Sequence, residues 1–235
     1  MKQLHMLKYF ISFCFVFLVT KGFTQEKTAV TKDTITYTSP YGLRIGIDIS
    51  KPILGFIDKN FSGFEIIGDY RITKRVFVAA ELGYEKETSI EDYTNSTAKG
   101  SYIKLGINFN AYKNWLDMNN EIFLGLRYGF SIFDQTLNSY TSNTGSEYFV
   151  TTPVTTPITE TGLNAHWTEF VFGLKVETLK NLFLGVSFSY KIMLSVKDPA
   201  NFKTHYVPGF NRVFASDTGF GFNYTISYTI PFVNK

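Results

Sequence analysis

The chain has 235 residues, 44% of them hydrophobic and 17% aromatic, and this content of large apolar side chains excludes a disordered protein. Its formal net charge of +3 comes from 23 basic and 20 acidic residues. Three of the lysines lie in the first 24 residues, which carry no acid, so the remainder is balanced in charge. A balanced chain lacks the basic surface that binds nucleic acid, and no nucleic-acid partner is expected.

The N-terminus has the pattern of a secretory signal peptide. Lys2 and Lys8 precede an apolar run over residues 9–19, and Gly22 and Thr24 stand at suitable −3 and −1 positions for cleavage. The run is shorter than the ~20 residues that span a bilayer as a helix, which argues against a membrane anchor. We expect a signal peptide over residues 1–24 and a periplasmic N-terminal leader over residues 25–40.

Alternation of apolar and polar residues with period two, the pattern of β-strands, recurs eight times after the leader, and no sustained helical period appears. The runs cover residues 41–49, 63–72, 76–85, 102–112, 121–132, 167–177, 182–194 and 219–232. Most are long enough to cross the hydrocarbon layer as tilted strands, which takes ~9–11 residues, whereas strands of globular proteins average ~5–6.

The connections between these runs alternate between long and short. The long ones are residues 50–62, 86–101, 133–166 and 195–218, and the shorter ones are residues 73–75, 113–120 and 178–181. This alternation predicts one rim of long loops and one rim of tight turns, as in transmembrane barrels, whereas a soluble β-sandwich predicts none. We therefore predict an all-β fold over residues 41–235, an eight-stranded antiparallel up-and-down transmembrane β-barrel with both termini periplasmic.

The two faces of the predicted strands differ in polarity. One face is apolar and carries Leu43, Ile45, Ile47, Ile49, Leu105, Ile107, Phe109, Leu124, Leu126, Tyr128, Phe130, Phe170, Phe172, Leu174, Val176, Leu184, Val186, Phe188 and Tyr190. The other carries Arg44, Asp48, Glu65, Asp69, Arg71, Glu81, Lys104, Glu121, Arg127, Glu169, Lys175 and Lys191, with several glycines between them. Eight strands enclose an interior just wide enough for side chains, so the glycines and paired charges are expected inside and the bulky apolar residues outside. A soluble carrier of the lipocalin type has the reverse arrangement.

The last strand ends in YTISYTIPF, and the predicted signal peptide ends in GFT, followed by Gln25. With the eight alternating strands, these features make residues 25–235 resemble the small outer-membrane β-barrels of Bacteroidota, in particular an uncharacterised family of them. The resemblance implies that the last strand closes the barrel against residues 41–49 and is recognised by the barrel-assembly machinery during insertion. The residues of this terminal-strand assembly signal would be Tyr224, Tyr228, Ile230 and Phe232. The tail Val233-Asn234-Lys235 departs from the pattern, because it leaves the signal slightly internal.

Two further implications come from the same resemblance. A multi-subunit envelope complex is the expected setting of such a barrel, and the outer-membrane protein assembly machinery is one such complex. Asp33-Thr34-Ile35 resembles the Asp-Thr/Ser-apolar motif that is glycosylated in exported proteins of this phylum. An ordinary polar leader is the alternative interpretation of these three residues.

The sequence offers little for catalysis. His166 and His205 are the only histidines beyond the signal peptide, and a Ser/His/acid arrangement would have to combine His166 with Glu169 and with Ser195 or Ser216. Nothing in the spacing selects such a triad. No metal-ligand spacing occurs, no cofactor is expected, and a lumen packed with charges leaves no pore. The alternatives that remain open are an outer-membrane lipid-modifying or lipid-hydrolysing enzyme, a small-ligand-binding barrel and a soluble carrier.

The long connections hold many apolar residues for loops in water. The candidate partner-binding residues are Ile53, Leu54, Phe56, Tyr140, Tyr148, Phe149, Phe202, Tyr206, Phe210 and Phe214. Those of residues 195–218 either fold over the barrel mouth or are buried against a partner. We expect a non-enzymatic structural or accessory subunit that contacts outer-membrane lipid and binds other outer-membrane or surface proteins through its outer loops.

Overall fold

The computed structural model describes residues 40–112, 119–142 and 152–234. The predicted signal peptide, the leader up to residue 39 with Thr34, and the loop residues Tyr148 and Phe149 lie outside the described residues. What the sequence predicts for them stays a prediction.

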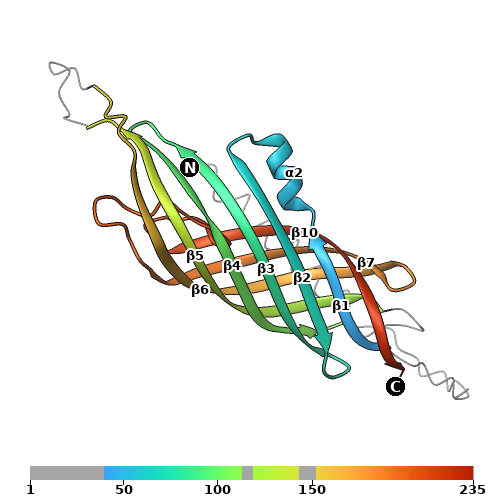
Figure 1. Ribbon diagram of the computed structural model, residues 1–235. Helices are drawn as coiled ribbons and strands as arrows, with labels where there is room; N and C mark the ends of the chain where they lie inside the picture. The colour runs from blue at the N-terminus through green and yellow to red at the C-terminus, as the bar shows by residue number, and fades with distance from the viewer. Residues whose placement is uncertain (1–39, 113–118, 143–151, 235) are drawn as a thin grey trace, which may run out of the picture. The chain divides into compact units, whose positions relative to one another are not determined.

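Eight antiparallel strands form a closed barrel in the order β1-β10-β7-β6-β5-β4-β3-β2 (Figure 1). The strands are β1 (Pro40–Asp48), β2 (Phe61–Arg71), β3 (Val76–Ile90), β4 (Thr94–Asn110), β5 (Glu121–Tyr140), β6 (Ile158–Leu179), β7 (Leu182–Val196) and β10 (Thr218–Asn234). β10 closes the barrel against β1, with Tyr228 opposite Ile45 and Ile226 opposite Ile47. The predicted eight-stranded antiparallel barrel and its closing strand are thereby confirmed.

The barrel has two distinct ends. At one end, named here the terminal end, β1 begins and β10 ends, and the short connections β2–β3 and β6–β7 lie there (Figure 1). At the other end, named here the helix end, the β1–β2 connection forms the helix α2 (Ser50–Ile57). The β7–β10 connection at the helix end contains a small two-stranded sheet of β8 (Tyr206–Val207) and β9 (Asn211–Arg212).

Several strands extend further at the helix end than the sequence predicts. β3 and β4 continue to a tight turn at residues 91–93, and β5 and β6 contain 20 and 22 residues. Much of this extension is polar and therefore lacks the apolar alternation used to predict strands. Cross-strand hydroxyl pairs stabilise it instead: the Oγ1 atoms of Thr88 and Thr97 lie 3.0 Å apart, as do those of Thr136 and Thr159.

The helix α2 is a second difference from the prediction of a loop. Its eight residues, SKPILGFI, are too few to show a helical period, and Pro52 and Gly55 resemble turn residues. Proline is nevertheless compatible with the first turn of a helix, because the N–H groups there have no partner within the helix.

The outside of the barrel is apolar around its whole circumference. This surface, named here the apolar belt, consists of Ile45, Ile47, Ile66, Tyr70, Val78, Leu82, Leu105, Ile107, Leu124, Leu126, Phe170, Phe172, Phe188, Tyr190, Phe220, Phe222 and Tyr228, all of them exposed. The charged residues predicted for the lumen are buried, apart from Glu81, whose side chain keeps 15% exposure. The face assignment is confirmed, and it is the arrangement of barrels surrounded by lipid rather than by water.

Candidate functional site at the helix end of the barrel

The terminal half of the lumen is held together by an ion network around Arg44. Its guanidinium lies 2.8 Å from Asp69 and 2.9 Å from Glu121, and Lys175 also pairs with Asp69. The ring of Phe183 covers the guanidinium at 4.7 Å. Each charge has an opposite charge in contact, which offsets the free-energy cost of removing it from water.

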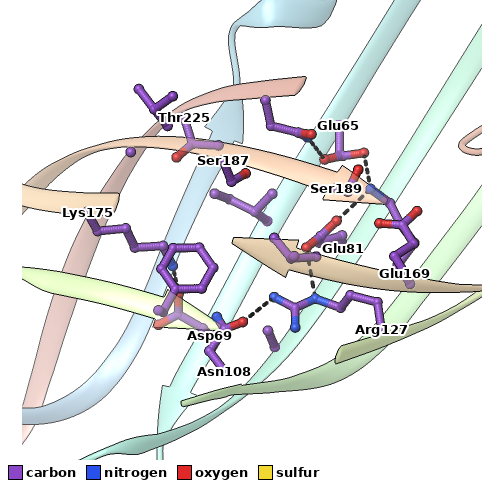
Figure 2. A pocket seen from close by; sticks show the side chains of 18 of the residues that line it. Glu65, Asp69, Glu81, Asn108, Arg127, Glu169, Lys175, Ser187, Ser189 and Thr225 are labelled. Atoms are coloured by element: carbon purple, nitrogen blue, oxygen red, sulfur yellow. Dashed lines mark hydrogen bonds and ion pairs between the residues drawn. The ribbon is translucent and has the colours of Figure 1, made fainter. Parts of the chain in front are cut away.

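A second network fills the middle of the lumen (Figure 2). Lys104 Nζ lies 2.6 Å from Glu81 and 3.0 Å from Glu65, and Arg127 bridges Glu81 at 3.1 Å and Asn108 at 2.7 Å. The cavity between these side chains measures about 40 Å³, which is room for a few water molecules. The lumen at this level is thus a packed polar core.

The helix end of the lumen is filled by the β7–β10 connection. Residues 206–210, named here the plug, turn into the barrel mouth, where Val207 and Phe210 are fully buried. Phe210 packs edge-on against Trp167 with 6.1 Å between ring centroids. The surrounding apolar cluster consists of Tyr102, Phe133, Leu163, Ala165, Trp167 and Met193. The plug therefore belongs to the core of the barrel.

Gly209 allows the plug to make this turn. Its φ of +84° lies in the left-handed region, and a Cβ atom built on it would stand 2.6 Å from Cγ of Tyr102. Both the backbone conformation and the space therefore require glycine here.

Glu85 connects the plug, the helix α2 and the barrel wall. Its carboxylate accepts hydrogen bonds from Lys51 Nζ at 2.5 Å, from the Tyr206 hydroxyl at 2.8 Å and from the Gly209 N–H at 2.7 Å. The Tyr102 hydroxyl lies 3.2 Å from the same carboxylate. Burial by itself lowers the pKa of Lys51, but the nearby carboxylates of Glu85 and Glu65 raise it above its ordinary value.

Lys51 and Glu85 are functional candidates that the sequence does not reveal. Lys51 lies in a connection that the sequence predicts to be a loop, and Glu85 is the last residue of a predicted strand. The only sequence signal was that Glu85 continues the inward period of Glu81 along the same strand. Neither residue could be paired with the other before the fold was known.

The predicted partner-binding residues divide into two groups. Tyr206 and Phe210 are buried inside the barrel mouth, at 7% and 0% exposure. Their connection therefore folds over the mouth, which is one of the two alternatives considered, the other being burial against a partner. As placed here they present no surface to a partner, which corrects their assignment as partner-binding residues. Phe56 is 89% exposed, Ile53, Leu54 and Phe214 are about half exposed, and Phe202 and Tyr140 are partly exposed. Tyr140 ends β5, where its backbone bonds to Val154.

His166 and Glu169 do not come together. Tyr128 Oη lies 2.7 Å from His166 Nδ1 on the exposed side of β6, whereas Glu169 is buried in the lumen and accepts a hydrogen bond of 2.7 Å from Trp167 Nε1. Ser195 lies opposite His166 on β7, and Ser216 bonds to Thr218. The Ser/His/acid arrangement considered from the sequence is therefore not formed.

Two further features can be stated for the described part of the chain. Among residues 40–112, 119–142 and 152–234, no group of three or more His, Cys, Asp or Glu side chains could hold a metal ion. No helix within these residues is long and apolar enough to cross a membrane.

The chain belongs to the family described as "Domain of unknown function (DUF6048)", whose model matches residues 6–235. Among solved structures it is similar to Ail, the attachment invasion locus protein of Yersinia pestis, with 12% sequence identity and a TM-score of 0.41. The similarity covers 80% of this chain and 95% of the Ail chain. No curated protein matches the sequence.

Proposed function

We propose that the protein is an integral outer-membrane β-barrel without enzymatic activity, which acts as a structural or accessory subunit of an envelope protein complex. In this proposal the apolar belt faces lipid, both termini are periplasmic and the helix end faces outward. The belt around a lumen of paired charges supports this placement, because so much exposed apolar surface has a high free energy in water. We further propose, from the resemblance to barrels of Bacteroidota, that this complex is the outer-membrane protein assembly machinery.

The length of β5 and β6 supports a role outside the bilayer. At ~3.3 Å per residue and a tilt of ~40°, the 22 residues of β6 rise roughly 55 Å along the barrel axis, about twice the ~25 Å apolar band of such barrels. The polar Thr88–Thr97 and Thr136–Thr159 pairs lie in the part that extends past the belt. Such an extension is suited to contact with proteins at the surface.

The observation that carries the proposal is the exposure of apolar residues on α2. Phe56 is 89% exposed and Ile57 is 76% exposed, although Lys51 holds the helix firmly to the wall. Large apolar side chains on a fixed element are the usual centre of a protein–protein contact. A partner that covers this end of α2 would remove both side chains from solvent.

The test is purification of the full chain from its own membranes in mild detergent. We expect the wild type to co-purify with a defined set of proteins that the double variant Phe56→Ser/Ile57→Ser loses. The matched control is Tyr93→Ser, since Tyr93 is also exposed at the helix end, at 49%, but lies in the β3–β4 turn. A monodisperse barrel with no co-purifying protein, or a double variant that keeps every partner, contradicts the subunit role.

The membrane placement has a separate test. Recovery of the native protein in the soluble periplasmic fraction would contradict it. The expected contact with the barrel-assembly machinery during insertion would use the outward side chains of β10, of which Tyr228, Ile230 and Phe232 are 50%, 41% and 61% exposed. Replacing these three by serine is expected to slow insertion while leaving export unchanged.

A further inference from the structure

The wall of the barrel is incomplete between β1 and β10 at the helix end. β1 pairs with β10 as far as Asp48, which lies opposite Thr225, and the chain then turns into α2. β10 continues past this point to Thr218 and remains paired with β7 on its other side. Beside this part of β10 lie α2 and, next to Phe220, the short strand β9, which pairs with β8 and not with β10.

The uncovered edge of β10 carries hydrogen-bond donors. Both backbone groups of Tyr224 face the β1 side, because its N–H donates to Asp48 Oδ1 at 3.1 Å and its carbonyl accepts from Ile49 N at 2.8 Å. Alternate residues of a strand point the same way, so Phe222 and Phe220 also direct their backbone groups into the opening.

The backbone carbonyl groups of Phe222 and Phe220 accept hydrogen bonds, whereas their N–H groups have no backbone acceptor among the described residues of β1 and α2. The two carbonyls accept hydrogen bonds from Ser50 Oγ at 3.4 Å and from Asn211 Nδ2 at 3.0 Å. Within the described residues, neither N–H group donates to a backbone carbonyl of β1 or α2. An unpaired backbone N–H next to apolar surface carries a free-energy cost that a bound acceptor would remove.

A groove of about 840 Å³ passes through this opening. Its outer part is lined by Phe220 and Phe222 of the apolar belt and by Ile53 and Leu54 of α2, and its inner part reaches Lys51 and Lys191. The volume is that of ligand pockets, which are mostly apolar with a few polar groups at one place. The groove thus connects the surface of the belt with the cationic side chains at the helix end of the lumen.

The polar groups at the inner part are mainly donors. Lys191 Nζ donates to the carbonyls of Gly209 at 2.7 Å and Phe210 at 3.3 Å, and Lys51 pairs with Glu85. The acids that line the groove are Asp58, which directly follows α2, and Glu87, which lies on β3 opposite Phe61. An apolar channel that ends in ammonium and N–H groups is complementary to an apolar chain with an acceptor-rich head.

We propose that this groove binds one long acyl chain of an amphiphile whose head group is rich in acceptor oxygens, such as a carboxylate, a phosphate or an ester. The chain lies between α2 and the aromatic residues of β10, and the head group faces Lys191, Lys51 and the N–H groups of Phe220 and Phe222. A peptide strand fits less well, because its second edge would remain unpaired beside hydrocarbon. The inference rests on the placement of the belt in lipid but requires no protein partner.

The test uses the full chain in dodecyl maltoside and in phospholipid vesicles. The probes are palmitic acid with a photoreactive diazirine in its chain and phosphatidylcholine with the same chain, and the labelled peptides are mapped by mass spectrometry. We expect labelling of residues 53–54 and 220–222 about tenfold above that of residues 170–172, which belong to the belt on β6, two strands away from β10, as for a site rather than for surrounding lipid. The probe that gives this enrichment distinguishes a free fatty acid from a lipid chain.

A matched pair of substitutions makes the test specific. Phe222 and Phe172 both belong to the belt, with exposures of 50% and 49%, but only the first lines the groove. Phe222→Ala is expected to lower labelling at residues 53–54 about tenfold, as the loss of one buried aromatic contact would, whereas Phe172→Ala leaves it unchanged. Leu54→Ser is the second variant, since α2 takes no part in strand pairing.

Two outcomes overturn the inference. Equal labelling at residues 220–222 and 170–172 would mean that the groove holds no more than the surrounding lipid does. Enriched labelling that survives both Phe222→Ala and Leu54→Ser would place the chain elsewhere. Absence of labelling around the whole belt would instead contradict the membrane placement, so the two failures are distinguishable.

Discussion

Lys51 Nζ lies 2.5 Å from Glu85 Oε1, and this ion pair joins the helix of the first connection to the third strand of the barrel. The same carboxylate receives the Tyr206 hydroxyl and the Gly209 N–H from the plug. One buried acid thus holds both elements that close the helix end. The ion pair and hydrogen bonds that Glu85 makes offset the free-energy cost of removing its charge from water, as those of the other buried charges in the lumen do.

Glu85→Gln is expected to loosen the plug and α2 together. The substitution leaves Lys51 buried without an opposite charge in contact, which costs about 3–5 kcal/mol. Hydrogen exchange should rise in residues 50–57 and 206–210 and not at the terminal end. The control is Glu91→Gln, whose ion pair with Arg212 is exposed on both sides and contributes at most about 1 kcal/mol.

A second variant separates the charge from the packing. Lys51→Met combined with Glu85→Gln removes both charges, and it is expected to recover part of the lost protection because no unpaired ion remains. If the double variant exchanged faster than Glu85→Gln alone, the ion pair would not be the cause of the loosening.

The attachment of α2 is expected to be lost only at high pH. Because the carboxylates of Glu85 and Glu65 outweigh burial and raise the pKa of Lys51 above 10.5, the stabilisation is fully present below pH 10.5. It disappears as the pH rises through the raised pKa. A fluorophore on Phe56→Cys, in a chain without the lone Cys14, reports the release of the helix. Lys51→Arg should shift the transition upward, and a transition below pH 10 in the parent would contradict this assignment.

Gly209→Ala is expected to displace the plug. The new Cβ would meet the Tyr102 ring at 2.6 Å, and the left-handed backbone alone costs about 1–2 kcal/mol for a residue with a side chain. The fluorescence of Trp167, which packs against Phe210, should shift to the red in a Trp115→Phe background. Gly162→Ala is the control: its φ is also positive, +67°, but no atom lies within 4 Å of the added Cβ. An equal effect of both substitutions would show that backbone conformation, not the contact with Tyr102, is decisive.

Leu126→Lys places a charge on the apolar belt and is expected to destabilise the barrel in phospholipid vesicles by ~2–4 kcal/mol. Denaturant unfolding at equilibrium measures the change in the free energy of unfolding. Gly125→Lys, one position earlier, points into the lumen, where an added Cβ stands 2.6 Å from Asn108 Oδ1. The destabilisation by Gly125→Lys comes from crowding and should be similar in any detergent. The destabilisation by Leu126→Lys should be smaller in a detergent that lets water reach the belt.

Local periodicity was sufficient for the wall of the barrel. Each inward residue of β10 alternates with an outward one, so Thr225 and Ser227 could be assigned to the lumen and Tyr228 to the outside before any contact was known. The extension of β5 and β6 was missed because its outward threonines show no apolar period. They stabilise strands through cross-strand hydroxyl pairs, which involve residues distant in sequence.

The sequence by itself determined the number of strands, their faces, the charge-lined lumen and the closing strand, because each follows from a period-two pattern read within one segment. Only the tertiary structure decided that Tyr206 and Phe210 turn inward, that Lys51 meets Glu85, and that the pairing of β1 with β10 stops at Asp48, where the chain turns into α2. These features arise where segments distant in the chain come together, and their free energy depends on contacts that no single segment contains.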